Sequence, residues 1–305
     1  MHLMPLAAAH PLVAARALPT LSLALPTCSA TGVWVLAGAS GCVGLLAQGG
    51  LTVLFSKSND PVLSESAGYV AHQVVACALM VSVTVLGLLA WLNPPLVAAT
   101  AAGRLLAPSD GARWLGAMLL GMLVAWDIPT SLAIPQLRKP DLLAHHLGMA
   151  AVALVGAVWL PTHYGYYYMG VAELSSIPLT LFDLSEKAAE ASKKDAEIKE
   201  DEPSKNRATR LRALRDALRI VMAVSFILVR AIDFTRVTLT RFVPDALTVL
   251  GSATTAASFR LPLQFMLVSS VSFVGLQLYW LSLYARISLA QRARDQRRKS
   301  KKSGQ

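Results

Sequence analysis

Residues 126–173 have the sequence WDIPTSLAIPQLRKPDLLAHHLGMAAVALVGAVWLPTHYGYYYMGVAE, and this stretch decides the fold class. Its apolar runs carry ionisable side chains, namely Asp127, His145, His146 and Glu173. Ionisable groups are costly in hydrocarbon and are tolerated where they face a protein interior or a wet cavity. We therefore predict three membrane helices that turn these polar groups toward one shared interior.

The composition of the whole chain agrees with a multi-pass membrane protein. Of its 305 residues, 54% are hydrophobic and only 15% are charged, whereas soluble domains carry roughly 25% charged residues. The apolar residues come in runs of about 20, and at about 1.5 Å per helical residue such a run crosses a hydrocarbon core of about 30 Å. The predicted class is an all-α, multi-pass transmembrane protein.

Seven segments are predicted to span the membrane. Between the fifth and the sixth, residues 184–212 are a dense mixture of Lys, Glu, Asp, Ala and Arg, which predicts a solvated loop that is partly helical. Gly38, Gly41 and Gly44 in the first span indicate a close approach between helices. The spans cover about residues 33–55, 67–92, 114–134, 142–161, 163–183, 213–237 and 261–287.

The segments outside these spans have distinct compositions. Residues 1–31 contain four prolines and no acid, which predicts a loosely ordered leader or a targeting peptide. Residues 94–113 are apolar but broken by Gly and Pro, which predicts a loop with an interfacial segment. Residues 238–260 are rich in small residues, Ser and Thr, and a loop is predicted there as well.

The placement of the net charge of +10 argues against a nucleic-acid partner. Most Lys and Arg lie in the loops 136–141 and 184–212 and in the basic tail 291–305, which seven spans place on one side of the membrane. Positive loops mark the cytosolic side, so the N-terminus is predicted to be lumenal or outside and the C-terminus cytosolic. The tail can also bind anionic lipid headgroups.

His145 and His146 are the first candidates for chemistry. Adjacent helix positions differ in direction by about 100°, so the two rings cannot both face one point. One imidazole can act as a general base or nucleophile, with Asp127, at similar depth in the preceding antiparallel span, orienting it. A metal site that adds Asp127 and Glu173 is an alternative, although adjacent histidines are poor metal geometry. In the plain structural alternative these groups only form hydrogen bonds and a salt bridge.

Glu173 and Arg230 form the second candidate group. Each lies inside an apolar run, where an unpaired charge is costly, so we predict an ion pair between them that is either structural or functional. Asp233 is a competing local partner for the arginine. The single histidines His72 and His163 are predicted to be packed or interfacial.

The order of several motifs resembles the TLC-domain family. The resemblance covers about residues 60–290 and is carried by His72, by WD at 126–127 and by the motifs LRKPDLLAHH, GVAELSSIPL, FILVR and LQLYW. It implies a membrane domain over residues 32–290 in which six of the seven helices form a barrel around a central, lipid-sized cavity. The residues expected to line that cavity are His72, Asp127, His145, His146, Glu173 and Arg230.

In the ceramide synthase branch of this family, the His pair serves acyl transfer from acyl-CoA to a sphingoid amine. Carried over, His145 and His146 would be catalytic, assisted by Asp127. This chain departs from that branch, because LGM follows the His pair and the segment 173–176 stands where the branch has paired aspartates. It is more similar to the non-synthase members, which are associated with membrane lipid composition, and endoplasmic reticulum residence is an expectation from the family.

Three functions follow as hypotheses, and whether the protein is an enzyme stays open. The first is lipid binding or lipid homeostasis, with an acyl chain or lipid held in the polar-lined cavity and no metal or cofactor. The second is an acyl-CoA-dependent acyltransferase, in which acyl-CoA is a substrate. The third is a non-catalytic structural or cargo-binding membrane protein whose buried charges hold the bundle together.

Overall fold

The computed structural model describes residues 29–303, and every regular element in that range is helical. The predicted all-α class is therefore confirmed. Most of the predicted leader, residues 1–28, lies outside the described residues. Its last residues are helical instead, because α1 begins at Ala30 after the N-cap Ser29, whose hydroxyl accepts a hydrogen bond from the Gly32 amide.

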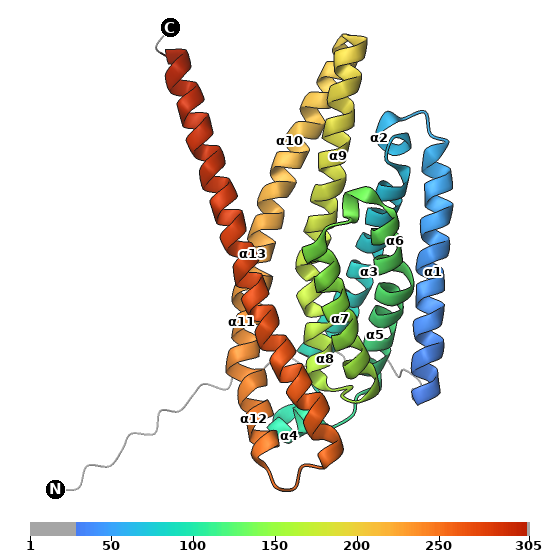
Figure 1. The fold of residues 1–305 in the computed structure, drawn as a ribbon, viewed down its shortest axis with the longest axis vertical. Coiled ribbons are helices and arrows are strands. Elements are labelled where there is room, and N and C mark those ends of the chain that lie inside the picture. Colours follow the sequence, from blue (N-terminus) through green and yellow to red (C-terminus); the bar gives the residue numbers. More distant parts are fainter. Residues whose placement is uncertain (1–28, 304–305) are drawn as a thin grey trace, which may run out of the picture.

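The helices run alternately between the two ends of the molecule (Figure 1). The first four passes are α1 (Ala30–Ser56), α3 (Ala67–Leu92), α5 (Asp110–Gly121) with η2 (Met122–Asp127) and α6 (Ile128–Ala133), and α7 (Pro140–Val158). The fifth consists of α8 (His163–Tyr168), η4 (Val171–Ser175) and α9 (Ser176–Lys199). The sixth consists of α10 (Glu202–Ser225), η5 (Phe226–Asp233), α11 (Phe234–Val237), η6 (Thr238–Phe242) and α12 (Val243–Gly251), and the seventh is α13 (Ala257–Ser303). Short helices, α2 (Pro61–Ser64), η1 (Leu96–Ala99), α4 (Ala101–Leu106) and η3 (Pro135–Leu137), lie in the connections.

Five helices of the described part are long and apolar enough to cross a membrane, which makes the protein an integral, multi-pass membrane protein. They are Thr31–Ser56, Ala67–Leu92, Asp110–Ala133, Pro140–Val158 and Ala257–Arg286. The other two predicted spans differ in construction. The span predicted at 163–183 is divided by η4, and the one at 213–237 carries six charged residues. A count of seven bilayer crossings therefore remains a prediction.

The loop predicted at residues 184–212 is instead mostly a helical hairpin of α9 and α10. Pairs of opposite charge three or four residues apart, such as Lys199 with Asp195, support a solvent-exposed helix. The turn is made by Glu200, the only non-glycine residue with positive φ (55°) among the described residues. Asp201 then caps α10 by accepting a hydrogen bond from the Ser204 amide at 2.9 Å.

Two further boundaries differ from the sequence-based expectation. The loop predicted at residues 238–260 is largely helical, since η6 and α12 continue the sixth pass as far as Gly251. The tail predicted at residues 291–305 continues helix α13 up to Ser303. Small and charged residues can extend a helix when its start is already anchored by packing, so composition alone placed both ends too early.

Six passes close into a ring, and α1 lies outside it. Contacts lead from α3 to α5, α7, α13, η5 and α10, then to α9 and back to α3, whereas α1 packs on α3, α5 and η2. This arrangement agrees with the expected six-helix barrel with one additional N-terminal helix. The close approach predicted for α1 is confirmed at Gly44, where a Cβ atom would lie 2.8 Å from Cγ of Trp126, but Gly38 faces open space.

Aromatic side chains of α8 fill one half of the ring interior. Tyr164, Tyr167 and Tyr168 are buried and pack with Phe234 and Phe242 of the sixth pass. Each phenol hydroxyl also has a polar partner on that pass, as buried tyrosines usually do. This half is therefore largely a packed core, in which a second, narrow pocket lies beside Tyr164, Tyr168 and Phe242.

Polar contacts fasten the connections at both ends of the bundle. At one end, Arg104 of α4 makes two hydrogen bonds to Asp245 of α12, at 2.6 and 2.8 Å, and Tyr164 donates to the same carboxylate at 2.6 Å. At the other end, Arg207 of α10 bonds to Asp60, the N-cap of α2, at 2.5 Å. The two arginine contacts connect residues that are more than 100 positions apart in the chain.

Candidate functional site

The first polar cluster joins α3, η2 and α7 around the buried carboxylate of Asp127. Oδ1 of Asp127 lies 3.2 Å from Nε2 of His72, and Oδ2 contacts Nδ1 of His146. Each ring thus presents a nitrogen to a different carboxylate oxygen. The predicted contact between Asp127 and the His pair is confirmed for His146, and His72 is an additional partner.

A π-helical turn positions this carboxylate. In η2 the Ile128 amide donates to the carbonyl of Leu123, five residues earlier, instead of four as in an α-helix. Pro129 follows directly, and because proline has no N–H and its ring crowds the preceding turn, a locally widened helix accommodates it. Segments of this kind often occur at functional sites, and here the widened turn carries Trp126 and Asp127 to the inner face.

His72 is held by three neighbours. Its ring stacks on Trp126 with centroids 4.8 Å apart and an interplanar angle of 23°. Its Nδ1 lies 3.2 Å from Oγ1 of Thr130, which itself bonds to the Trp126 carbonyl at 2.8 Å. These contacts fix the ring so that Nε2 faces Asp127. The expectation of a merely packed histidine was therefore too weak, because His72 is packed and also contacts the carboxylate of Asp127.

His145 points away from this cluster. Its ring meets Trp280 and Phe273 edge-on, with centroids 5.1 and 5.6 Å away, and lies 5.8 Å from the ring of His146. Its Nδ1 is buried and has no hydrogen-bond partner among the described residues. The two adjacent histidines therefore face different neighbours, as helix geometry predicted.

The second polar cluster is a buried ion pair between η4 and η5. Nη2 of Arg230 lies 2.9 Å from Oε2 of Glu173, and its Nε donates to Oγ of Ser175 at 2.9 Å. Ser176 donates to the same Glu173 oxygen at 2.7 Å and accepts from Arg230 at 3.1 Å. The predicted Glu173–Arg230 pair is confirmed. Asp233, the competing partner, bonds instead to Arg236 and Tyr167.

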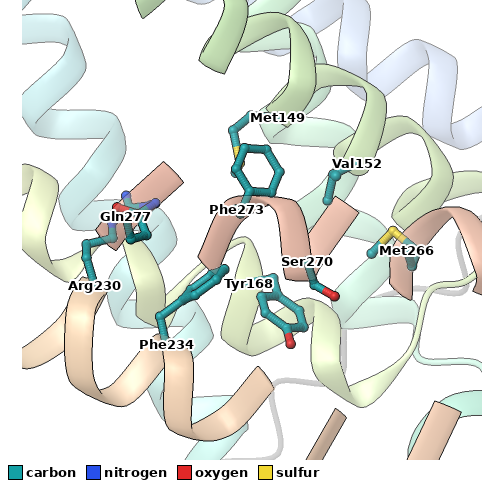
Figure 2. A pocket seen from close by; sticks show the side chains of 9 residues that line it. All are labelled: Met149, Val152, Tyr168, Arg230, Phe234, Met266, Ser270, Phe273 and Gln277. Atoms are coloured by element: carbon teal, nitrogen blue, oxygen red, sulfur yellow. The ribbon is translucent and has the colours of Figure 1, made fainter. Parts of the chain in front are cut away.

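A pocket lies between α7, α8, the η5–α11 segment and α13 (Figure 2). It encloses about 390 Å³ of empty space, which includes the part that opens to the outside. Most of its lining is apolar or aromatic, and the polar groups come from Arg230, Gln277, Ser270 and Tyr168. The complete lining is Met149, Val152, Tyr168, Arg230, Phe234, Met266, Ser270, Phe273 and Gln277.

The six predicted cavity residues therefore do not share one chamber. Among them only Arg230 lines this pocket, and Glu173 forms an ion pair with Arg230 without lining the pocket itself. His145 touches the pocket wall through Phe273, and the remaining three form the separate cluster around Asp127. The expectation of one shared interior is corrected to two polar clusters with His145 between them, since neighbouring residues on a helix point to different sides.

Gln277 is the functional candidate that the sequence analysis missed. Its side chain is completely buried (0% exposed), it lines the pocket, and neither amide atom has a hydrogen-bond partner among the described residues. A signal was present in the sequence, because Gln277 is a polar residue inside the apolar run LQLYW. In the sequence, that motif served only as part of the resemblance to the TLC-domain family.

The described residues include no group of three or more His, Cys, Asp or Glu side chains arranged to hold a metal ion. Glu173 is engaged by Arg230 and Ser176 and does not approach Asp127 as the metal alternative required. The Asp127–His146 contact is instead an arrangement suited to proton transfer, because a carboxylate can orient an imidazole and stabilise its charged form.

Comparison with known protein families gives a match to one family model. The model described as the TLC domain matches residues 69–286, which is well over half of the chain and includes both clusters and the pocket. Neither the comparison with curated proteins nor that with solved structures finds a match.

Proposed function

The chain belongs to the TLC-domain family, and we propose that it binds a membrane lipid inside its ring of helices and serves lipid homeostasis. The observation that carries this proposal is the pocket between α7, α8, η5 and α13. Its enclosed cavity volume is only about 20 Å³, so a bound acyl chain must displace the flexible methionine side chains of the lining. Part of the pocket opens to the outside, which a ligand needs in order to enter.

The lining of the pocket supports a lipid as the ligand. Met149, Val152, Met266 and Phe273 offer an apolar wall for an acyl chain, whereas Arg230 provides a buried polar contact. A site built mainly from apolar groups with a few placed polar ones matches the general chemistry of ligand pockets. The ion pair with Glu173 keeps the arginine in place without a ligand, so the polar end of the site is preformed.

We further propose residence in the endoplasmic reticulum with the C-terminus in the cytosol. In Figure 1 the α2 connection, the α9–α10 hairpin and the end of α13 lie at one end of the bundle. Residues from this end contact one another, as in Lys194 with Glu65 and Arg207 with Asp60. This end is rich in basic residues, which supports a cytosolic position. Protease protection of tags at each terminus in sealed microsomes tests the orientation.

A second function is favoured by the Asp127–His146 contact. In an acyl-CoA-dependent acyltransferase, His146 would accept a proton from an acceptor amine or hydroxyl through Nε2, since Nδ1 faces Asp127. The acceptor would attack the thioester carbonyl, the C–S bond would break, and the coenzyme A thiolate would take up a proton. Asp127 would position the ring and stabilise its charged form.

One experiment separates the two functions. The lipid composition of cells that lack the protein is compared with that of cells expressing wild-type protein or the His145→Ala/His146→Ala double variant, and acyl transfer from acyl-CoA is measured in their membranes. Lipid binding predicts that the double variant restores the lipid composition, whereas acyl transfer predicts that it does not. His163→Ala is the matched control, because His163 is a buried histidine stacked on Trp91, away from both clusters.

Purification tests lipid binding directly. The full chain, extracted in mild detergent and analysed by native mass spectrometry, is expected to carry a bound lipid at near-stoichiometric amounts. Protein of normal stability that carries no lipid and takes up none on addition would refute the proposed function. A changed lipid composition in cells together with lost acyl transfer in the double variant would favour the acyltransferase.

A further inference from the structure

We propose that Gln277 and Arg230 form a recognition site for the head of an uncharged acyl lipid that carries both an ester carbonyl and a hydroxyl group, as mono- and diacylglycerols do. This inference rests on the proposed lipid-binding function and names the ligand class of the same pocket. Both residues line the pocket, Gln277 from α13 and Arg230 from η5. Figure 2 shows them together at one end, with Met266 at the other.

The unpaired amide of Gln277 is the starting point. A buried polar group without a partner costs free energy, on the order of 1–3 kcal/mol, and such groups are rare in folded proteins. Gln277 leaves both its donor, Nε2, and its acceptor, Oε1, without partners among the described residues. A ligand that satisfies both atoms must offer an acceptor and a donor, which a carbonyl oxygen and a hydroxyl group provide.

The charge balance of the site favours a lipid with an uncharged headgroup. Arg230 is already neutralised by Glu173 at 2.9 Å. A carboxylate or phosphate placed beside this pair would add a net negative charge to a buried environment, which is unfavourable without another cation. Among the described residues, no second Lys or Arg lines the pocket. Neutral hydrogen-bonding groups therefore fit the site better than anionic headgroups.

The rest of the pocket suits an acyl chain that leads away from the polar end. From Gln277 the wall continues along α13 through Phe273 and Ser270 to Met266, residues spaced three or four apart on one face of the helix. Val152 of α7 lies toward the Met266 end in Figure 2. Methionine and aromatic side chains adapt to flexible apolar ligands, so this wall can follow an acyl chain.

The test measures binding of three probes to the purified full chain in nanodiscs: a diacylglycerol, a triacylglycerol without a hydroxyl, and a fatty acid with a carboxylate. Wild-type protein is expected to prefer the diacylglycerol. Gln277→Leu should weaken diacylglycerol binding roughly 10- to 100-fold, the effect of one unmatched buried polar group. Gln48→Leu is the matched control, because Gln48 is also buried (7% exposed) but lies on α1, outside the ring.

The thermal stability of the lipid-free protein provides a second readout. Gln277→Leu removes an unsatisfied polar group, so the empty variant should unfold at the same temperature as wild-type protein or higher. A purely structural glutamine would give the opposite result. A photoactivatable diacylglycerol bound to wild-type protein should label residues 266–277 or 149–152, and this measurement needs no variant.

The outcomes separate this inference from the proposed function. If wild-type protein binds lipid but Gln277→Leu binds the diacylglycerol equally well, the inference is wrong and the lipid-binding function stands. Preference for the fatty acid, or labelling confined to the outer face of α1, would also overturn the inference alone. If wild-type protein binds none of the probes and carries no lipid, both proposals fall.

Discussion

Replacing Glu173 and Arg230 separately by uncharged residues should reveal how much their ion pair contributes to the free energy of unfolding. Arg230→Met removes a guanidinium that bonds to Glu173, Ser175 and Ser176, and leaves a buried carboxylate with one serine as its partner. Breaking a buried pair from one side costs about 3–5 kcal/mol. Glu173→Gln keeps an amide oxygen that accepts from the arginine, so a smaller loss of about 1–3 kcal/mol is expected.

The double variant Glu173→Gln/Arg230→Met is the decisive member of the series. It contains neither charge, so no uncompensated ion remains buried, and its loss should be smaller than the sum of the two single losses by up to about 3 kcal/mol. At about 2–4 °C per kcal/mol, Arg230→Met should unfold roughly 6–20 °C below wild-type protein. The measurement is thermal unfolding of the detergent-purified full chain, followed by tryptophan fluorescence.

Arg236→Met is the matched control on the same pass. Its ion pair with Asp233 is at 2.6 Å, but both side chains are exposed, by 50% and 36%. Exposed pairs contribute about 0–1 kcal/mol, so this variant should stay close to wild-type protein. Losses that simply add in the double variant, or an equal effect of Arg230→Met and Arg236→Met, would show that the buried charges are not coupled and would refute the reasoning.

Three further predictions concern packing and the ends of the bundle, and thermal unfolding of the purified chain checks each. Tyr164→Phe removes the hydrogen bond to the buried carboxylate of Asp245 and should lower the free energy of unfolding by about 1.5–3 kcal/mol. An unchanged Tm would show that Arg104 alone satisfies that carboxylate. Gly44→Val pushes a side chain into Trp126 and should lower the free energy of unfolding by about 1–3 kcal/mol. Gly49→Val is the control, because a Cβ atom there meets nothing within 4 Å. Equal losses of stability in the two variants would contradict the packing of α1 on Trp126. Burial raises the pKa of Asp60, but the hydrogen bonds from Arg207 and the Val62 amide, together with the nearby positive charges, outweigh burial and hold the pKa below its ordinary value. The contribution of this partly exposed pair, at most about 1 kcal/mol, is therefore present at neutral pH and lost as the pH falls below about 4. Asp60→Asn should abolish that pH-dependent part only.

The two predicted polar contacts could be derived from the sequence because each follows from a simple energetic argument. Glu173 and Arg230 lie within apolar runs, so each needs a counter-charge, and they satisfy one another. Asp127 and His146 lie near the adjoining ends of two consecutive antiparallel spans, which places them at the same depth. Neither argument requires knowledge of how the helices are rotated.

The contacts that were not predicted from the sequence depend on helix rotation and on local helix winding. His72 reaches Asp127 because its ring is fixed by Trp126 and Thr130, and Gln277 lines the pocket because that face of α13 turns inward. The π-helical turn in η5, which shifts the residues after it around the helix axis, has no proline to mark it in the sequence. Two separate clusters could therefore not be distinguished from one shared chamber by sequence alone.

The amino-acid sequence by itself determined that this protein is a helical, multi-pass membrane protein of the TLC-domain type and that its buried charges need partners. Those properties follow from the free-energy cost of placing polar groups in hydrocarbon. That cost depends only on the type of each residue and on its position in an apolar run. The tertiary structure alone decided that tyrosines of α8 pack into one half of the interior and that a glutamine without a hydrogen-bond partner among the described residues lines a pocket. Such outcomes depend on how the packed helices are rotated relative to one another. That rotation is determined by contacts between helices far apart in the chain, so it cannot be derived from any one segment.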